Sequence, residues 1–293
     1  MGKTPFVSII IPVYNDTLRL RQCIKALEEQ TYPKECYEII VIDNGSKDNL
    51  LEVKSFENVR LEFETKSSQF AARNKGVAIS RGKILAFTDS DCIPSPQWIE
   101  SGVKSMLEQY NCGIIGGAVN FFFKASKPNL IELYDSLFFL QQKRYIEDIK
   151  FAVTANLFTF REVFDKVGLF NETLRSGGDG EWGKRVFNHD YNIVYSADAI
   201  INHPARYELS DLYKKIKRVT GGKFLREKRA DESFLRFWKV NFLEFLFGIK
   251  RILKLKNVAL YRKIELFILE LSIQLLRMHE LARLKYGKTP ERQ

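Results

Sequence analysis

The chain has 293 residues, of which 45% are hydrophobic, so it is long enough for one large domain, or for one domain with an appendage, around a sizeable core. Charged side chains such as Lys239 and Glu270 interrupt its longest apolar stretches, which fall short of the roughly 18–20 uncharged residues of a membrane-spanning helix. The first residues do not resemble a signal peptide.

The net charge of +10 is distributed unevenly. Residues 206–293 contain 22 Lys and Arg against 10 Asp and Glu, whereas residues 1–205 contain 24 against 26. The basic excess therefore belongs to the last third, which either faces an anionic surface or is a solvated helical face.

Apolar runs and helical periodicities alternate along residues 5–205, which predicts a doubly wound, mostly parallel α/β sheet flanked by helices. The predicted strands are Phe6–Val13, Glu38–Ile42, Val59–Phe63, Lys83–Thr88, Cys112–Val119, Phe151–Phe160, Tyr191–Ser196 and Ala199–His203. The predicted helices are Thr17–Gln30, a polar helix after Ser46, Ser67–Ser80, Pro94–Gln109, a piece around Leu130–Tyr145, Arg161–Val167 and a helix that ends near His189.

After Pro204 the composition changes to long helical stretches, predicted as Glu208–Arg229, Phe234–Leu255 and Leu260–Tyr286. We therefore predict two parts, residues 1–205 as the α/β domain and residues 206–293 as a basic helical extension. The four cysteines show no C-x-x-C spacing, so we expect reduced, buried thiols and no zinc site.

Two carboxylates directly follow one of the predicted strands. The apolar run Lys83–Thr88 is followed by Asp89-Ser90-Asp91. Side chains at i and i+2 of an extended segment point to one face, and open α/β sheets usually bind ligands at the carboxyl ends of their strands. Because Mg²⁺ and Mn²⁺ prefer oxygen ligands, the pair predicts a site for one of these ions together with a diphosphate.

Other motifs surround this acidic pair in a definite order. They are Pro12-Val13-Tyr14-Asn15, Asp43-Asn44-Gly45-Ser46, Ala72-Arg73-Asn74-Lys75-Gly76 and, after the acidic pair, Gly178-Asp179-Gly180-Glu181. This series resembles glycosyltransferase family 2 over about residues 5–205. The resemblance implies a GT-A fold and an inverting transfer from a nucleotide-sugar. The last third of the chain has no counterpart in it.

The resemblance implies a nucleoside site at the first two strand ends. Asp43 matches the residue that reads the uracil ring, and Tyr14 can stack on the base. Pro12 and the loop after it, with Asn15, would border the nucleoside. From the residues alone, Asp43 is equally suited to form a turn before Asn-Gly, and a Tyr after a strand often serves packing.

The same resemblance implies a diphosphate and metal site. Arg73 suits a base or diphosphate contact through its planar guanidinium. Asp89, with Ser90 beside it, resembles the ribose-contacting carboxylate, and Asp91 the ligand of Mn²⁺ or Mg²⁺. His203 stands where many GT-A enzymes complete the metal site, with a purely structural His as the alternative.

The Gly-rich acidic loop is the predicted acceptor side. Asp179 is the candidate general base and Glu181 the alternative, because an inverting transfer needs a carboxylate near the attacking hydroxyl. The family loop usually begins with Glu where this chain has Gly178, which leaves the choice between the two acids open. A helix start with Asp near the positive end of the dipole is the structural interpretation. Trp182 either packs beside the acceptor or lies in the core.

The basic extension combines cations with aromatic residues at near-helical spacing. The cations are Lys214, Lys215, Lys217, Arg218, Lys223, Arg226, Lys228 and Arg229, and the apolar residues are Phe234, Phe237, Trp238, Phe242, Phe245 and Leu246. This pattern favours peripheral contact with an anionic membrane, on the inner face of the cell membrane. A bundle that packs on the catalytic domain, or a homodimer, is the alternative.

We therefore predict a cytoplasmic, metal-dependent inverting glycosyltransferase that moves a sugar, with UDP as the nucleotide implied by the resemblance, to a hydroxyl of a glycan or polyprenyl-linked acceptor. A sugar nucleotidyltransferase would have a Gly-rich loop with an Arg after the first strand, which Val13–Asp16 does not offer. A basic binding protein without catalysis is the other alternative. Nucleic-acid binding is not expected, since recognition modules are missing and basic charge alone is a weak signal.

Overall fold

The computed structural model describes residues 4–174, 176–229, 234–256 and 258–286, and side chains except those of residues 226–241. Its contacts divide the chain into two compact units. The α/β unit comprises residues up to 122, 140–174 and 178–204, and the helical unit comprises residues 123–139, 175–177 and those from 205 onward. The helical unit therefore includes a segment, 123–139, that lies well before the boundary predicted at residue 205.

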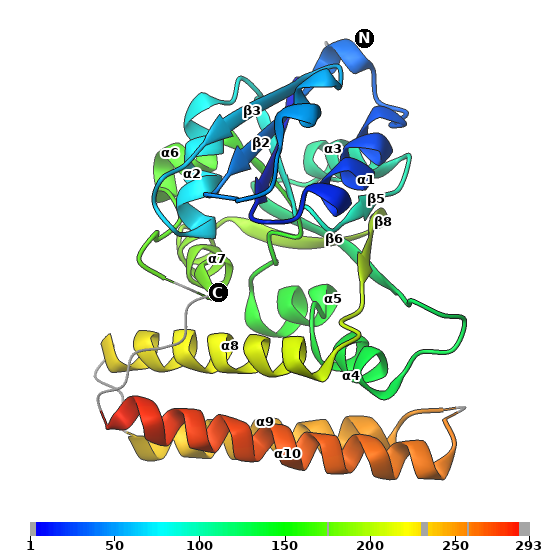
Figure 1. Cartoon of the computed structure of the whole chain (residues 1–293). Helices are drawn as coiled ribbons and strands as arrows, with labels where there is room; N and C mark the ends of the chain where they lie inside the picture. Colours follow the sequence, from blue (N-terminus) through cyan, green and yellow to red (C-terminus); the bar gives the residue numbers. More distant parts are fainter. Residues whose placement is uncertain (1–3, 175, 230–233, 257, 287–293) are drawn as a thin grey trace. The chain divides into compact units, whose positions relative to one another are not determined.

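An eight-stranded sheet with the order β3-β2-β1-β4-β7-β6-β8-β5 forms the α/β unit (Figure 1). The strands are β1 (Val7–Val13), β2 (Tyr37–Asp43), β3 (Val59–Phe63), β4 (Ile84–Thr88), β5 (Ile93–Pro94), β6 (Cys112–Phe122), β7 (Asn156–Phe160) and β8 (Asn192–Pro204). The helices of this unit are α1 (Thr17–Glu28), α2 (Gln69–Ile79), α3 (Trp98–Glu108), α5 (Gln142–Arg144), α6 (Arg161–Val167) and α7 (Gly178–Asn188), with the shorter turns η1 (Lys34–Cys36), η2 (Leu51–Ser55) and η3 (Tyr145–Ile149).

The predicted fold class is confirmed, with differences in detail. Four of the seven strand pairings are parallel, and the other three are antiparallel because β7 inserts between β4 and β6 and β5 pairs with β8. The polar helix expected after Ser46 is only the short turn η2. The two final predicted strands form the single strand β8, because its pairing with β6 continues across a register shift at Gly117 and Ala118.

Alternating side chains of β1 bury two different layers. Ile9 and Ile11 pack in one core with α1 and α3, and Ile10 packs in another with residues of α2, α6 and α7. Figure 1 shows these helix groups on the two sides of the sheet. Period-two alternation in a strand buried on both faces explains why β1 is apolar except for Ser8, which is buried and donates to Glu38.

The helical unit contains α4 (Leu130–Phe138), α8 (Leu209–Arg229), α9 (Phe234–Leu253) and α10 (Leu260–Lys285). Its core includes Tyr134, Leu212, Ile252 and Leu266, which come from all four helices. Within the described residues no helix combines the length and apolar character needed to cross a membrane.

Candidate active site

The end of β8 brings His203 to the acidic pair. Asp91 and Cys92 lead directly into β5, whose Ile93 pairs with Asn202 of β8. On the other side of β8, His203 pairs with Phe121 of β6, and the two rings make an edge contact with centroids 5.6 Å apart. Strand register therefore fixes His203 next to Asp91, although the two residues are far apart in the sequence.

A buried amide supports this part of the sheet. Asn156 of β7 is fully buried and donates to the carbonyl oxygens of Ala118 and Ala199 at 2.8 Å each, while Trp98 donates to its oxygen. A Cβ at Gly117 would lie only 2.1 Å from the Ala199 oxygen, so only glycine permits this close approach. Asn156 thereby satisfies the carbonyl groups at the register shift between β6 and β8.

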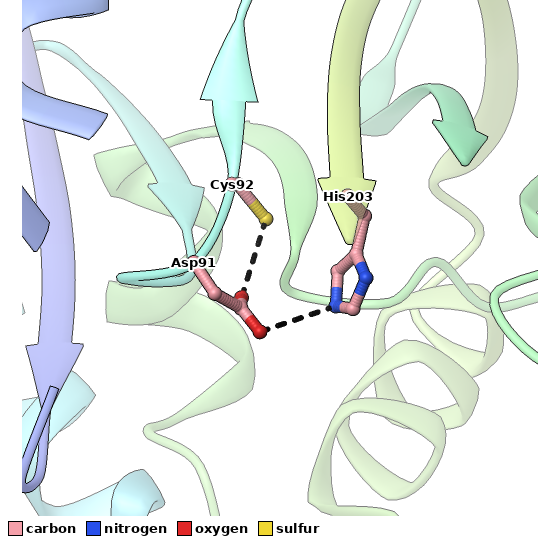
Figure 2. Close-up of side chains that lie close together, drawn as sticks. All are labelled: Asp91, Cys92 and His203. Carbon is pink, nitrogen blue, oxygen red and sulfur yellow. Dashed lines mark hydrogen bonds and ion pairs between the residues drawn. The ribbon is translucent and has the colours of Figure 1, made fainter. Parts of the chain in front are cut away.

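The carboxylate of Asp91 and a ring nitrogen of His203, two groups that can bind a cation, point toward one another (Figure 2). Nε2 of His203 lies 3.6 Å from Oδ2 of Asp91, and its Nδ1 lies 2.7 Å from the carbonyl oxygen of Pro204. Because a carbonyl only accepts, Nδ1 carries the proton in the neutral ring and Nε2 presents a lone pair. Two electron-pair donors thus point at one region, an arrangement that suits a divalent cation.

Cys92 is the third member of the only group of three possible metal-ligating residues within the described part of the chain. Its Sγ lies 3.9 Å from Oδ1 of Asp91, and the residue is fully buried. Burial, and then the charges of Asp91 and Asp89, raise the pKa of this thiol well above its ordinary value. The thiol therefore stays protonated, and oxygen and nitrogen remain the ligands that the site offers.

Arg73 is a buried cation at the same end of the sheet. Its side chain is 2% exposed, and Nη2 donates to Oδ1 of Asp89 at 2.6 Å. Among the described residues, its Nε and Nη1 have no hydrogen-bond partner. A buried guanidinium with two nitrogens that lack an acceptor is costly unless a ligand accepts from them. Asn74, the next residue, has a structural role, because its side chain makes hydrogen bonds to Phe170 and Glu172 and so holds the loop of residues 170–172.

Two residues that the sequence interpretation missed adjoin the acidic pair. Asp16 accepts from Ser90 at 3.1 Å, and Arg19 contacts both Asp16, at 2.7 Å, and Oδ2 of Asp91, at 3.7 Å. Burial raises the pKa of Asp16, with Arg19 acting in the opposite direction. Only the Asp-x-x-Arg spacing at the start of α1 hinted at them, and that pattern is common on surface helices.

The predicted nucleoside residues lie on the loops that follow β1 and β2. Tyr14 is 49% exposed, so it does not serve core packing. Asn15 connects the two loops, because its backbone N–H donates to the Ser46 hydroxyl and its side-chain oxygen accepts from the Lys47 N–H. Asp43 is buried, and its Oδ1 accepts from the Ser46 N–H at 2.8 Å, which is the turn-forming contact. Pro12 lies within β1, opposite Ile42.

The acidic loop is helical from its second glycine. Gly178 begins α7, and the acids Asp179 and Glu181 lie in its first turn. A Cβ at Gly178 would lie 2.6 Å from the ring of Phe70 in α2, so glycine allows α7 to pack on the helix that carries Arg73. Steric fit therefore explains why this chain has Gly where the family has Glu.

The two candidate bases differ in their contacts. Both carboxylate oxygens of Glu181 contact Arg185, at 2.7 and 3.2 Å. Oδ1 of Asp179 accepts from the Gly180 N–H at 2.9 Å. Trp182 is fully buried, stacks on Phe164 and donates to the Gly168 oxygen, so of its two predicted positions, beside the acceptor or in the core, it occupies the core.

Known proteins resemble this chain in sequence and in fold. The family model described as "Glycosyl transferase family 2" matches residues 8–168. The chain is 40% identical over 227 residues to glycosyltransferase AglE of Haloferax volcanii, which covers 74% of this chain and 73% of that protein. It is 20% identical over 262 residues, 83% of this chain and 81% of the relative, to a Methanococcus voltae dolichyl N-acetyl-alpha-D-glucosaminyl phosphate 3-beta-D-2,3-diacetamido-2,3-dideoxy-beta-D-glucuronosyltransferase.

Among solved structures, a mannosyltransferase from Pyrobaculum calidifontis, in complex with GDP-Man and Mn²⁺, resembles the fold with a TM-score of 0.62 and 15% identity, covering 98% of this chain and 77% of that one. The family match spans more than half of the chain and contains β2, which carries Asp43, and the turn between β4 and β5, which carries Asp89 and Asp91. The chain belongs to glycosyltransferase family 2 and is a glycosyltransferase with a GT-A type fold.

Proposed function

We propose that this glycosyltransferase transfers a sugar from a nucleoside diphosphate donor to a hydroxyl of a glycan or lipid-linked saccharide, with a divalent cation bound at Asp91 and His203. The observation that carries the proposal is that Nε2 of His203 and Oδ2 of Asp91 face each other at 3.6 Å. A bound Mn²⁺ or Mg²⁺ would supply Lewis-acid stabilisation to the departing diphosphate.

Arg73 and Asp89 are proposed to hold the donor. The two nitrogens of Arg73 that lack an acceptor, Nε and Nη1, suit phosphate or base oxygens, and its bond to Asp89 fixes the carboxylate that would contact the ribose. Tyr14 is exposed and available to stack on the base, and the second oxygen of Asp43 would accept from a base N–H.

We take a UDP-sugar as the donor by resemblance, whereas the GDP-Man in the Pyrobaculum calidifontis enzyme makes a guanine nucleotide the first competitor. Asp179 is proposed as the base that receives the acceptor proton, because it matches the Asp of the family's acidic loop, with Glu181 as the alternative. Inversion at the sugar follows from the family resemblance.

The acceptor is proposed to be lipid-linked, because the name of the Methanococcus voltae relative includes a dolichyl phosphate acceptor. Such an acceptor would place the enzyme on the cytoplasmic face of a membrane, in cell-surface glycan or glycoconjugate synthesis. Peripheral contact of residues 206–293 with that membrane would agree with such an acceptor, and a homodimer through the same residues is the competing arrangement.

The experiment is a calorimetric titration of the purified protein with UDP, GDP and dTDP, with and without Mn²⁺ or Mg²⁺. We expect one nucleotide to bind with micromolar affinity only when the metal is present. Equal affinity without metal would contradict the assignment of Asp91 and His203. No binding of any nucleotide would contradict the donor site as a whole.

A further inference from the structure

The outward face of α10 is apolar. From Leu260 to Leu275 every exposed side chain of this helix is apolar. These exposed residues are Leu260, Tyr261, Ile264, Phe267, Ile268, Leu271 and Leu275. They recur at a spacing of three or four residues and therefore form one continuous stripe, opposite the buried residues Leu266, Leu269 and Ile273.

The neighbouring helix extends this stripe. α9 contacts α10 and runs beside it (Figure 1). Its exposed large apolar residues are Phe242, Leu243, Leu246, Phe247 and Leu253. The side chains of Phe234, Phe237 and Trp238, which the sequence analysis also singled out, lie outside those described. We call the twelve exposed side chains of the two helices the apolar face.

The interior of the helical unit contains charged groups, although its apolar face is exposed. Glu132, Asp135, Glu270 and Glu280 are all at most 1% exposed. Asp135 accepts from Arg206 at 3.1 Å, Glu280 pairs with Arg283 at 2.7 Å, and Glu270 accepts from Tyr134. These four acids are thus buried where the structure gives them partners, while the twelve side chains of the apolar face are exposed. Such a surface is expected to contact an apolar phase.

Cations cluster where the two helices meet. Residues 250–263 contain six Lys and Arg and no Asp or Glu. Lys250, Lys254 and Lys256 are exposed. Positive charge beside an apolar stripe fits the boundary between anionic lipid head groups and acyl chains. A second copy of this chain carries the same positive charge at this place, so charge complementarity favours lipid over self-association.

We propose that the apolar face of α9 and α10 inserts in the plane of an anionic membrane, with Lys250, Lys254 and Lys256 on the lipid phosphates. The helices would lie in the interface and would not cross it, in agreement with the lack of a spanning helix among the described residues. The inference is independent of the donor, the metal and the catalytic base, since it rests on the helical unit alone.

The test is flotation of the full-length protein with vesicles, without nucleotide or acceptor. One set of vesicles is phosphatidylcholine, and the other contains roughly a third of anionic phosphatidylglycerol. We expect binding to the anionic vesicles that weakens at about 1 M salt, where the Debye length is about 3 Å. Failure to float with either composition would overturn the proposal.

Two variants separate the apolar and the charge contributions. The triple change Ile264→Ser, Ile268→Ser and Leu271→Ser should lower the vesicle affinity at least about tenfold, because it removes methyl groups that would be buried among the acyl chains. The triple change of Lys250, Lys254 and Lys256 to Gln should lower it by about fivefold per charge on anionic vesicles only. The matched control is Leu51→Ser with Leu107→Ser, which removes exposed leucines of the α/β unit.

The same variants distinguish lipid from a second copy. If light scattering finds a dimer of the parent protein that the Ser variant abolishes, and neither protein binds vesicles, the apolar face is a dimer interface and the proposal is wrong. Equal vesicle binding by the Ser variant, with an unchanged circular dichroism spectrum, would also overturn it. A loss of binding confined to the Ser and Gln variants supports insertion.

Discussion

At the residue scale, the proton on Nδ1 of His203 decides what the site offers. Pro204 accepts from that nitrogen, so in the neutral ring Nε2 faces Oδ2 of Asp91 with its lone pair. Arg19, at the start of α1, also contacts this oxygen of Asp91, at 3.7 Å. This local arrangement supports metal binding more directly than the Asp-x-Asp spacing does.

Asp91→Asn should weaken metal-dependent nucleotide binding by at least about tenfold, because an amide replaces the charged ligand. Calorimetry with Mn²⁺ and the preferred nucleotide measures the change. Asp165→Asn, an exposed carboxylate on α6, is the control and should bind as the parent does. Unchanged affinity of the Asp91 variant would disprove the metal assignment.

Asp179→Asn should lower turnover by about 10²–10⁴ while nucleotide affinity is kept, since general-base catalysis contributes on that order. Glu181→Gln should have a much smaller effect on turnover, because both of its oxygens contact Arg185 rather than an acceptor. Steady-state kinetics and calorimetry on both variants check the pair. An active Asp179 variant would move the base to Glu181 or to another residue.

At the element scale, a close contact fixes the start of α7. Gly178→Ala should destabilise the protein by about 1–3 kcal/mol, the cost typical of overpacking, because its Cβ would lie 2.6 Å from the Phe70 ring. Gly180→Ala is the matched control, since the nearest atom to its Cβ would be 3.8 Å away. Denaturant unfolding measures both. Adding Phe70→Leu should recover part of the lost stability, and equal effects of the two glycine changes would contradict the steric argument.

Inside the helical unit, the buried pair of Tyr134 and Glu270 predicts a pH dependence. Burial raises the pKa of Glu270 above its ordinary 4.5, although Tyr134 and Arg277 oppose the shift. A group with a raised pKa in the folded protein stabilises it fully below the unfolded value, and this contribution is lost as the pH rises through the folded value. Glu270→Gln keeps an acceptor for Tyr134 and removes the buried charge.

The Gln variant should therefore be more stable than the parent near pH 8 and should lose this advantage toward pH 4. Thermal melts across this range measure the difference. Two melting curves that stay parallel over the whole range would mean that Glu270 is not the group responsible.

At the scale of the whole molecule, residues 123–139 belong with the helices that follow residue 205. Asp135 of α4 is fully buried and is paired with Arg206 and, at 3.7 Å, with Lys215. Its neighbour Tyr134 lies in the core that α8, α9 and α10 complete. A cut at the predicted boundary of residue 205 would leave this charge and this ring without their partners.

We expect a chain that ends at residue 205 to aggregate or to melt well below the full-length protein. In the full-length protein, Arg206→Met with Lys215→Met should cost about 3–5 kcal/mol, the usual cost of breaking a buried ion pair. Size-exclusion chromatography and thermal melts check both changes. A monodisperse truncated chain with an unchanged melting temperature would support residue 205 as a true domain boundary.

The sequence by itself determined the α/β class, the positions of most strands and helices, and the order of the motifs that carry the family. These features depend on local patterns, such as the apolar run before Asp89 or the helical spacing of apolar residues in α3. Such patterns arise because the buried face of a strand or helix needs apolar residues at regular positions close together in the sequence. The acidic pair could be predicted for the same reason, because a strand end is a local feature.

Only the tertiary structure decided which distant residues meet. The pairing of β5 with β8 places His203 at Asp91, α1 brings Asp16 and Arg19 to the same place, and Trp182 goes into the core. The outward stripe of α10 was also hidden, since helical periodicity shows that a helix has two faces and not which of them is covered. Strand register and helix packing are set by non-local contacts, and no local pattern in the chain specifies them.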